Sequence, residues 1–106
     1  MEDTLFVQTV GFGSFIPEGE KESRDFANIV CADELSDNET KCGIITAKYD
    51  IFNKEGNPDL ELAAKIKTQV LEAMKKTGSF NPVPLKVVYG YNRKQGKKVL
   101  HIAGIK

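Results

Sequence analysis

The stretch Thr4-Leu-Phe-Val-Gln-Thr-Val-Gly-Phe-Gly-Ser-Phe-Ile16 indicates the fold class of this chain. Its β-branched and aromatic residues are typical of a strand, and Gly11 and Gly13 interrupt the pattern. Glycine inside a strand marks a bulge or a bend, as found where a sheet curls into a barrel. We therefore expect a bent first strand in a curled sheet.

Four further runs of residues have the composition of strands. Residues 24–32 and 42–52 flank a polar loop, and residues 83–91 and 98–105 flank a short loop that contains glycine. Each pair is typical of an antiparallel hairpin.

Residues 58–77, between the two hairpins, have the pattern of an α-helix. Asn57 is the expected N-cap ahead of Pro58, and Gly78 is the expected C-terminal stop. Apolar residues recur at three- and four-residue steps and so form one face, consisting of Leu60, Ala63, Ile66, Val70, Ala73 and Met74. The element order is strand, strand, strand, helix, strand, strand.

This order, over residues 1–106 as a single domain, is mainly β and resembles the OB-fold, a five-stranded Greek-key barrel. The helix, at about residues 58–77, would lie between strands 3 and 4. An α+β open sheet with one helix has the same order and is the alternative. Gly11, Gly13 and the chain length favour closure. The chain is similar in topology to the OB-fold single-stranded-DNA-binding proteins of phages and mobile genetic elements, which implies a role in DNA replication or transfer.

The sequence offers little for catalysis or metal binding. Cys31 and Cys42 have no partners at zinc-ligand spacing, and His101 is the one histidine. Gly11 and Gly13 lack the third glycine and the Lys-Ser ending of a phosphate-binding loop. We expect no enzymatic activity, no metal and no cofactor. His101 alternates with apolar residues and is expected to be partly buried and hydrogen-bonded.

The chain has no basic segment leading into an apolar stretch at its start, and no apolar run approaches the roughly 20 residues of a membrane helix. We therefore expect a cytoplasmic protein with no membrane contact. In that compartment Cys31 and Cys42 are expected to be two free, mostly buried thiols, although a cross-strand disulfide is the alternative.

The distribution of charge is more informative than its total, which is zero. Residues 1–59 hold 13 acids and 5 bases, a net charge of −8, whereas residues 60–106 hold 2 acids and 10 bases, a net charge of +8. Such asymmetry is a hint of contact with nucleic acid. The alternative is that acids and bases intermingle once the chain folds.

Candidate binding residues gather on the last hairpin. Tyr91 could stack on a base, and the cations beside it could neutralise phosphates: Arg93, Lys94, Lys97 and Lys98. Lysines at a hairpin tip can also serve only solubility and protection of the strand edge. Phe15 would lie at the rim of this site.

The third strand supplies two more candidates if loop 33–41 is symmetric. Cys31 then lies opposite Cys42 and Asp25 opposite Lys48, with Lys48 and Phe52 on the outward face that OB-folds use for binding. The opposite face would form the core, from Phe26, Val30, Ile45, Ala47, Tyr49 and Ile51. A slip of one residue would exchange these assignments.

The sequence thus predicts a non-enzymatic protein that binds single-stranded DNA with little sequence preference and forms a homo-oligomer, a dimer being the expectation. The alternative is a protein-protein interaction module whose acidic N-terminal half faces a basic partner. Its acids would be Glu18, Glu20, Glu22, Asp33, Glu34, Asp37 and Glu39.

Overall fold

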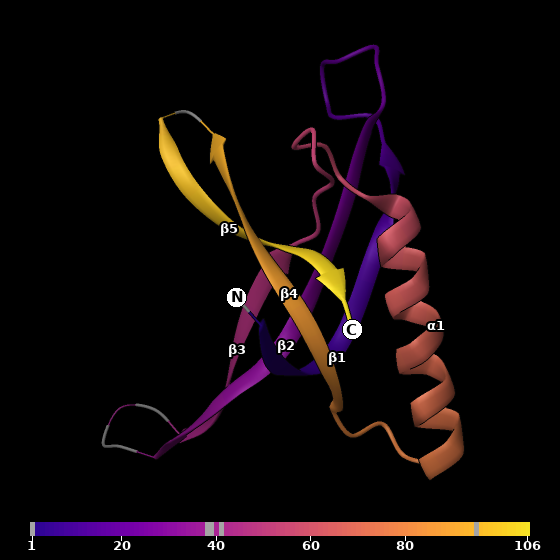
Figure 1. The fold of residues 1–106 in the computed structure, drawn as a ribbon, viewed down its shortest axis with the longest axis vertical. Helices are drawn as coiled ribbons and strands as arrows, with labels where there is room; N and C mark the ends of the chain where they lie inside the picture. The colour runs from indigo at the N-terminus through magenta and orange to yellow at the C-terminus, as the bar shows by residue number, and fades with distance from the viewer. Residues whose placement is uncertain (1, 38–39, 41, 95) are drawn as a thin grey trace.

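A computed structural model of the chain describes residues 1–106 except 1, 38, 39, 41 and 95, and the side chains of 34–37 and 94 also lie outside the described part. Five strands and one helix follow in the expected order (Figure 1). They are β1 Glu2–Phe15, β2 Arg24–Asp37, β3 Cys42–Asp50, α1 Leu60–Thr77, β4 Val83–Lys94 and β5 Lys97–Ile105.

The strands form one antiparallel sheet in the order β3-β2-β1-β4-β5, and β1 bends between its two neighbours. Residues 2–7 of β1 pair with β4, whereas residues 6–15 pair with β2. The expected irregularity in β1 is present, but it is a register shift between Val7 and Thr9 and does not lie at Gly11 or Gly13. The bulge allows β1 to pair with β4 through its first half and with β2 through its second half.

The curled sheet is a half-barrel, because the end of β3 comes back to β5. Ile51 forms a parallel bridge with Ile102, and the Phe52 N–H donates to the Ile102 carbonyl at 3.2 Å. The predicted mainly β, barrel-like fold with one helix between strands 3 and 4 is therefore confirmed over the open sheet.

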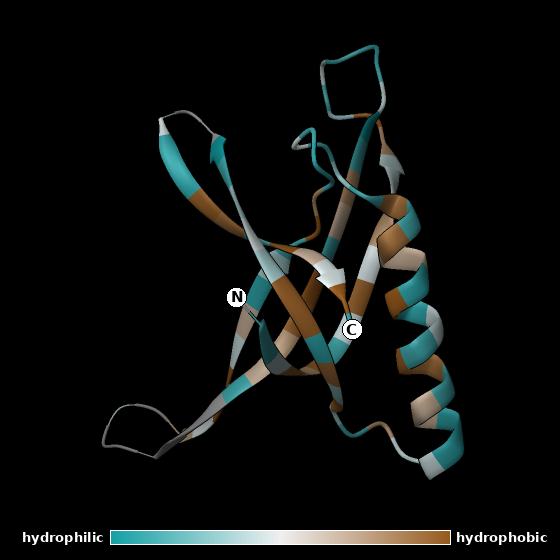
Figure 2. Cartoon of the chain, in the orientation of Figure 1, coloured by the Kyte–Doolittle hydropathy of each residue, from teal (hydrophilic) through white to brown (hydrophobic). Residues whose placement is uncertain are grey.

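Helix α1 packs against β1, β2 and β4, and its hydrophobic residues gather on the side toward the strands (Figure 2). Three residues of the predicted apolar face, Ala63, Ile66 and Val70, are buried. They join strand residues in one core: Val7, Ala27, Ile29, Cys31, Ile51, Leu85, Val87 and Ile102.

The helix begins at Leu60 and not at residue 58, and its N-cap is Asp59 instead of Asn57. The Leu62 N–H donates to Asp59 Oδ1 at 3.0 Å, which satisfies one of the free donors of the first turn. Asn57 belongs to the preceding loop, where its N–H donates to Asn53 Oδ1 at 3.0 Å. Gly78 ends the helix as expected, with a φ of 67°.

The predicted register of β2 and β3 is wrong. Cys31 lies opposite Ala47 and Val30 opposite Lys48, because β2 continues to Asp37, which pairs with Cys42. Residues 33–37 of the expected loop therefore belong to β2, with a register shift between Ala32 and Glu34.

This register exchanges the two faces of β2. Ala27, Ile29 and Cys31 point into the core, while the Phe26 side chain is 36% exposed on the outer face. In β3 and the residue after it, the predicted faces agree with the structure at three positions: Ile51 is buried, Tyr49 packs against the core and Lys48 is exposed.

Cys31 and Cys42 are free, as expected, but Cys42 is exposed and not buried. In the described part of the chain no helix is long and apolar enough to cross a membrane.

Candidate nucleic-acid interface

The tip of the β4–β5 hairpin brings a ring and cations together. Register pairs Arg93 with Lys98 and Tyr91 with Leu100, so Tyr91 and Lys98 are diagonal neighbours on one face. The Lys98 ammonium lies 4.3 Å from the centroid of the Tyr91 ring, which is a cation–π contact. The Tyr91 side chain is nevertheless 52% exposed. Its ring therefore remains accessible beside a positive charge.

Three cations of this hairpin have no carboxylate partner among the residues that the structure describes. Arg93, Lys97 and Lys98 are exposed, and none of them forms an ion pair with a residue that the structure describes. The Lys94 side chain lies outside the described residues. An exposed cation that has no carboxylate partner is available to a phosphate group.

A second exposed aromatic group lies where β1 and β2 meet. Phe15 and Phe26 contact edge to face, with ring centroids 5.9 Å apart, and are 49% and 36% exposed. A Cβ on Gly13 would lie 3.5 Å from the Phe26 ring, and one on Gly11 would lie 3.8 Å from it. Because neither glycine has a side chain, the Phe26 ring can lie directly over the backbone at Gly11 and Gly13.

The register expected from the sequence places Phe26 in the core, although the composition of β2 favours the opposite face. Positions 27, 29 and 31 of β2 are all apolar, whereas Asn28 interrupts the set 26, 28 and 30. A strand with one buried face places its uninterrupted apolar set inward. Phe26 is the aromatic residue of the candidate interface that the sequence reasoning missed.

Lys48 lies on the same outer face as Phe26. It is exposed and opposite Val30, and Val30 and Phe26 share a face because side chains alternate along a strand. The predicted outward position of Lys48 is therefore confirmed.

Phe52 is not an exposed ring, and this prediction is wrong. Its side chain is only 8% exposed and contacts His101 edge to face at 5.3 Å between centroids. The reason is that the chain leaves β3 at this point and reaches β5, so Phe52 packs over the contact between the end of β3 and β5.

His101 is more deeply buried than expected, with only 5% of its surface exposed. Contrary to the expected hydrogen bonding, its Nδ1 is buried with no partner among the described residues. A hollow of about 220 Å³ opens beside it, and its wall includes Tyr91, Asn92 and Lys54. The hollow adjoins the basic hairpin and carries amide and ammonium donors.

The two exposed aromatic groups lie toward one end of the molecule. The β4–β5 hairpin and the β1–β2 connection both project at the upper end in Figure 1. The β4–β5 hairpin carries Tyr91, Arg93, Lys97 and Lys98. Phe15 and Phe26 lie where β1 and β2 meet their connection. Lys48 lies farther along the outer face of the sheet, and Phe52 is withdrawn from the surface.

Searches of protein-family models, curated proteins and solved structures gave no match to this chain. Within the described residues, no group of three or more His, Cys, Asp or Glu side chains is placed to hold a metal ion.

Proposed function

We propose that this protein binds single-stranded DNA with little sequence preference. The observation that carries the proposal is the Lys98 ammonium 4.3 Å from the centroid of the half-exposed Tyr91 ring, on a hairpin that also presents Arg93 and Lys97. A ring can stack on any base, and the cations beside it can neutralise the flanking phosphates.

The aromatic component favours a single strand over a duplex. Bases in a duplex are already stacked on one another, so Tyr91, Phe15 and Phe26 would gain contacts only with unpaired bases. OB-fold barrels bind oligonucleotides on the face of strands 2 and 3 and on the loops after strands 1 and 4. Here Lys48 and Phe26 lie on the first of these surfaces, and the basic hairpin is the last.

The zero net charge limits the strength of the interaction. Binding would rest on a few local cations instead of a general positive field, so its affinity would be modest for each protomer and strongly dependent on salt.

The test is a fluorescence-anisotropy titration of a labelled oligothymidine at a series of salt concentrations, with a hairpin duplex of equal length as the comparison. We expect tighter binding to the single strand than to the duplex. The logarithm of the affinity should fall linearly with the logarithm of the salt concentration. Absence of binding at the lowest salt concentration would refute the proposal, and so would a preference for the duplex.

A further inference from the structure

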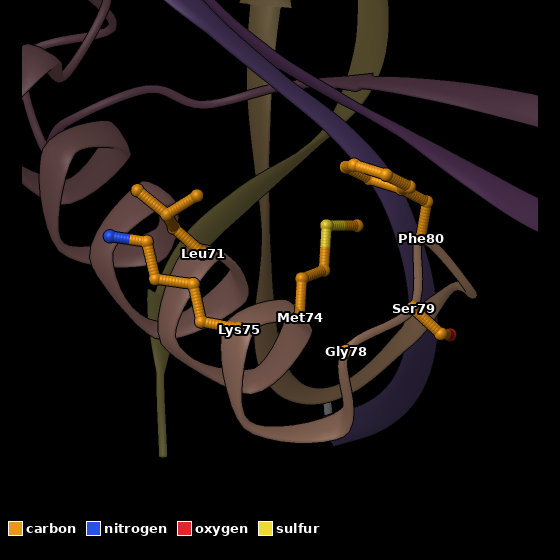
Figure 3. Close-up of a pocket in the computed structure, with 6 residues that line it drawn as sticks. All are labelled: Leu71, Met74, Lys75, Gly78, Ser79 and Phe80. Atoms are coloured by element: carbon orange, nitrogen blue, oxygen red, sulfur yellow. The ribbon is translucent and has the colours of Figure 1, made fainter.

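The C-terminal half of α1 leaves an apolar groove uncovered. Figure 3 shows Met74 between Leu71 and the ring of Phe80, which follows the helix. Leu71 is 44% exposed and Phe80 is 94% exposed, and the groove that they form with Met74 has a volume of about 350 Å³. A neighbouring hollow of about 270 Å³ shares Leu71 and Met74, so the apolar surface continues toward β1.

Two lysines border this surface. Lys75 lines the groove, and Lys67 lines the neighbouring hollow, where its ammonium lies 5.7 Å from the centroid of the Phe12 ring. In the described part of the chain neither lysine forms an ion pair. Glu72 is the exposed acid nearest to them in sequence. An occupant that suits this surface is therefore apolar and carries negative charge.

The β1–β2 connection of the same chain has these properties. Ile16 is 65% exposed, and Glu18 and Glu22 beside it are exposed and lie outside the two ion pairs of the described residues. The connection has a formed turn, because the Glu20 N–H donates to the Pro17 carbonyl at 3.0 Å. Glu20 also pairs with Arg24 at 2.6 Å. The turn thus presents an exposed isoleucine with two unpaired glutamates.

The two surfaces lie at opposite ends of the molecule. In Figure 1 the β1–β2 connection is at the top, and the end of α1 that leads into Phe80 is at the bottom. One chain cannot bring them together, whereas two copies placed end to end can. Such a contact joins different surfaces on its two sides, so it repeats along a chain of copies unless the rotation closes a ring.

We propose that the β1–β2 connection of one copy docks into the α1 groove of a second copy. Ile16 inserts against Leu71, Met74 and Phe80, and Glu18 and Glu22 face Lys67 and Lys75. This association involves no DNA, and the residues that form it differ from those of the proposed DNA interface. It makes the expected homo-oligomer a head-to-tail assembly and gives the acidic loop a basic partner.

Analytical ultracentrifugation of the full chain without DNA tests the contact. We expect the mass of the wild-type protein to rise with concentration, and we expect Ile16→Ser and Phe80→Ser each to remain monomeric. Both side chains are largely exposed, so neither substitution removes core packing. Ile44→Ser, at an isoleucine that is 59% exposed on β3, is the matched control and should associate like the wild type.

A mixture of the two monomeric variants gives the decisive result. The Ile16→Ser protein keeps an intact groove and the Phe80→Ser protein keeps an intact loop, so an equal mixture should form a one-to-one dimer and nothing larger. A wild-type protein that stays monomeric, a variant that associates like the wild type, or a mixture that stays monomeric would each overturn the proposal.

The charged part of the contact has its own readout. Glu18→Lys with Glu22→Lys should abolish association, as should Lys67→Glu with Lys75→Glu. Mixing these two proteins should restore association as an alternating head-to-tail chain, because the loop of each variant then faces a groove border of opposite charge on the other. Failure of this mixture to associate would overturn the pairing of the two surfaces.

Discussion

Phe52 and His101 meet edge to face, with ring centroids 5.3 Å apart, where the chain leaves β3 and reaches β5. The Phe52 N–H donates to the Ile102 carbonyl beside this contact, and Ile51 bridges to Ile102 on the core side. Two adjacent residues therefore close the half-barrel, one from inside and one from outside. A ring that the sequence suggested for binding has a structural role.

Phe52→Ala should destabilise the protein by about 3–5 kcal/mol, because it removes a buried ring and leaves a cavity over His101. Urea denaturation followed by circular dichroism measures the loss. Phe52→Leu, which keeps most of the buried volume, should lose less. An Ala variant with unchanged stability and weakened DNA binding would show instead that Phe52 is a binding residue.

Gly90→Ala should also destabilise the protein, because it crowds His101 where the end of β3 meets β5. A Cβ at this position would lie 2.7 Å from His101 Nε2 and 3.0 Å from the Ala103 Cβ, so the histidine must move. We expect a loss of about 1–3 kcal/mol in the free energy of unfolding. The matched control is Gly104→Ala on the next strand, where the nearest atom is 3.9 Å away and the change should stay within about 0.5 kcal/mol. Equal effects of the two substitutions would contradict the crowding at Gly90.

Asp59→Ala should lower the free energy of unfolding by about 1 kcal/mol, because the Leu62 N–H loses its acceptor at the start of α1. Asn57→Ala is the comparison, since the sequence suggested Asn57 as the cap. We expect a smaller effect there, because the structure uses the Asn57 backbone N–H in the loop. Thermal denaturation of both variants distinguishes the two caps, and a larger loss at Asn57 would refute the assignment.

Tyr91→Ala and Lys98→Gln should weaken DNA binding in different ways. Loss of the ring should cost about 1–3 kcal/mol of binding free energy with little change in salt dependence. Loss of the charge should reduce the slope of log affinity against log salt by about 0.7. Lys86→Gln, at an exposed lysine of β4 distant from the hairpin tip, is the control and should change neither quantity. If Tyr91→Ala and Lys98→Gln both bind DNA like the wild type, the hairpin is not part of the interface.

The stability of the protein should fall in alkaline solution. Burial, and secondarily the charge of Asp33, raises the pKa of Cys31 from 9.0 to about 11. The neutral buried thiol therefore contributes stability in full below pH 9, and this contribution is lost as the pH rises through about 11, because the unfolded thiol ionises first. Burial, Tyr49 and Asp3 also raise the pKa of Tyr89, which adds to the fall at the upper end of this range.

Cys31→Ala isolates the thiol in this experiment. Urea denaturation at intervals between pH 8 and 11 should show a shallower decline for the variant than for the wild type, with the Tyr89 contribution remaining. Parallel declines in the two proteins would contradict a protonated Cys31 in the folded state.

Much of the candidate site could be read from the sequence because it depends on local features. The hairpin with Tyr91 and its cations follows from two alternating runs around a short polar loop, and β-pairing across such a loop fixes which side chains are neighbours. The contact between Lys98 and Tyr91 is of this kind, since it joins residues on adjacent strands of one hairpin.

The β2–β3 pair shows why the remaining residues could not be placed in the same way. The polar residues between the two strands do not indicate where the chain reverses. The alternation of apolar and polar residues does not indicate the register shift between Ala32 and Glu34 either. One such uncertainty changes the face of every side chain in a strand. Phe26 therefore moved from the expected core to the surface.

The sequence by itself determined the order of the elements, the apolar face and C-terminal stop of α1, and the separation of negative from positive residues along the chain. These properties depend on neighbours within a few positions, where backbone preference and periodicity act directly. Only the tertiary structure decided that the register of β1 shifts between Val7 and Thr9, that Phe52 lies where the end of β3 meets β5, and that the acidic loop and the lysine-bordered groove lie at opposite ends. Each of those depends on contacts between residues distant in sequence, and the local pattern contains no record of such contacts.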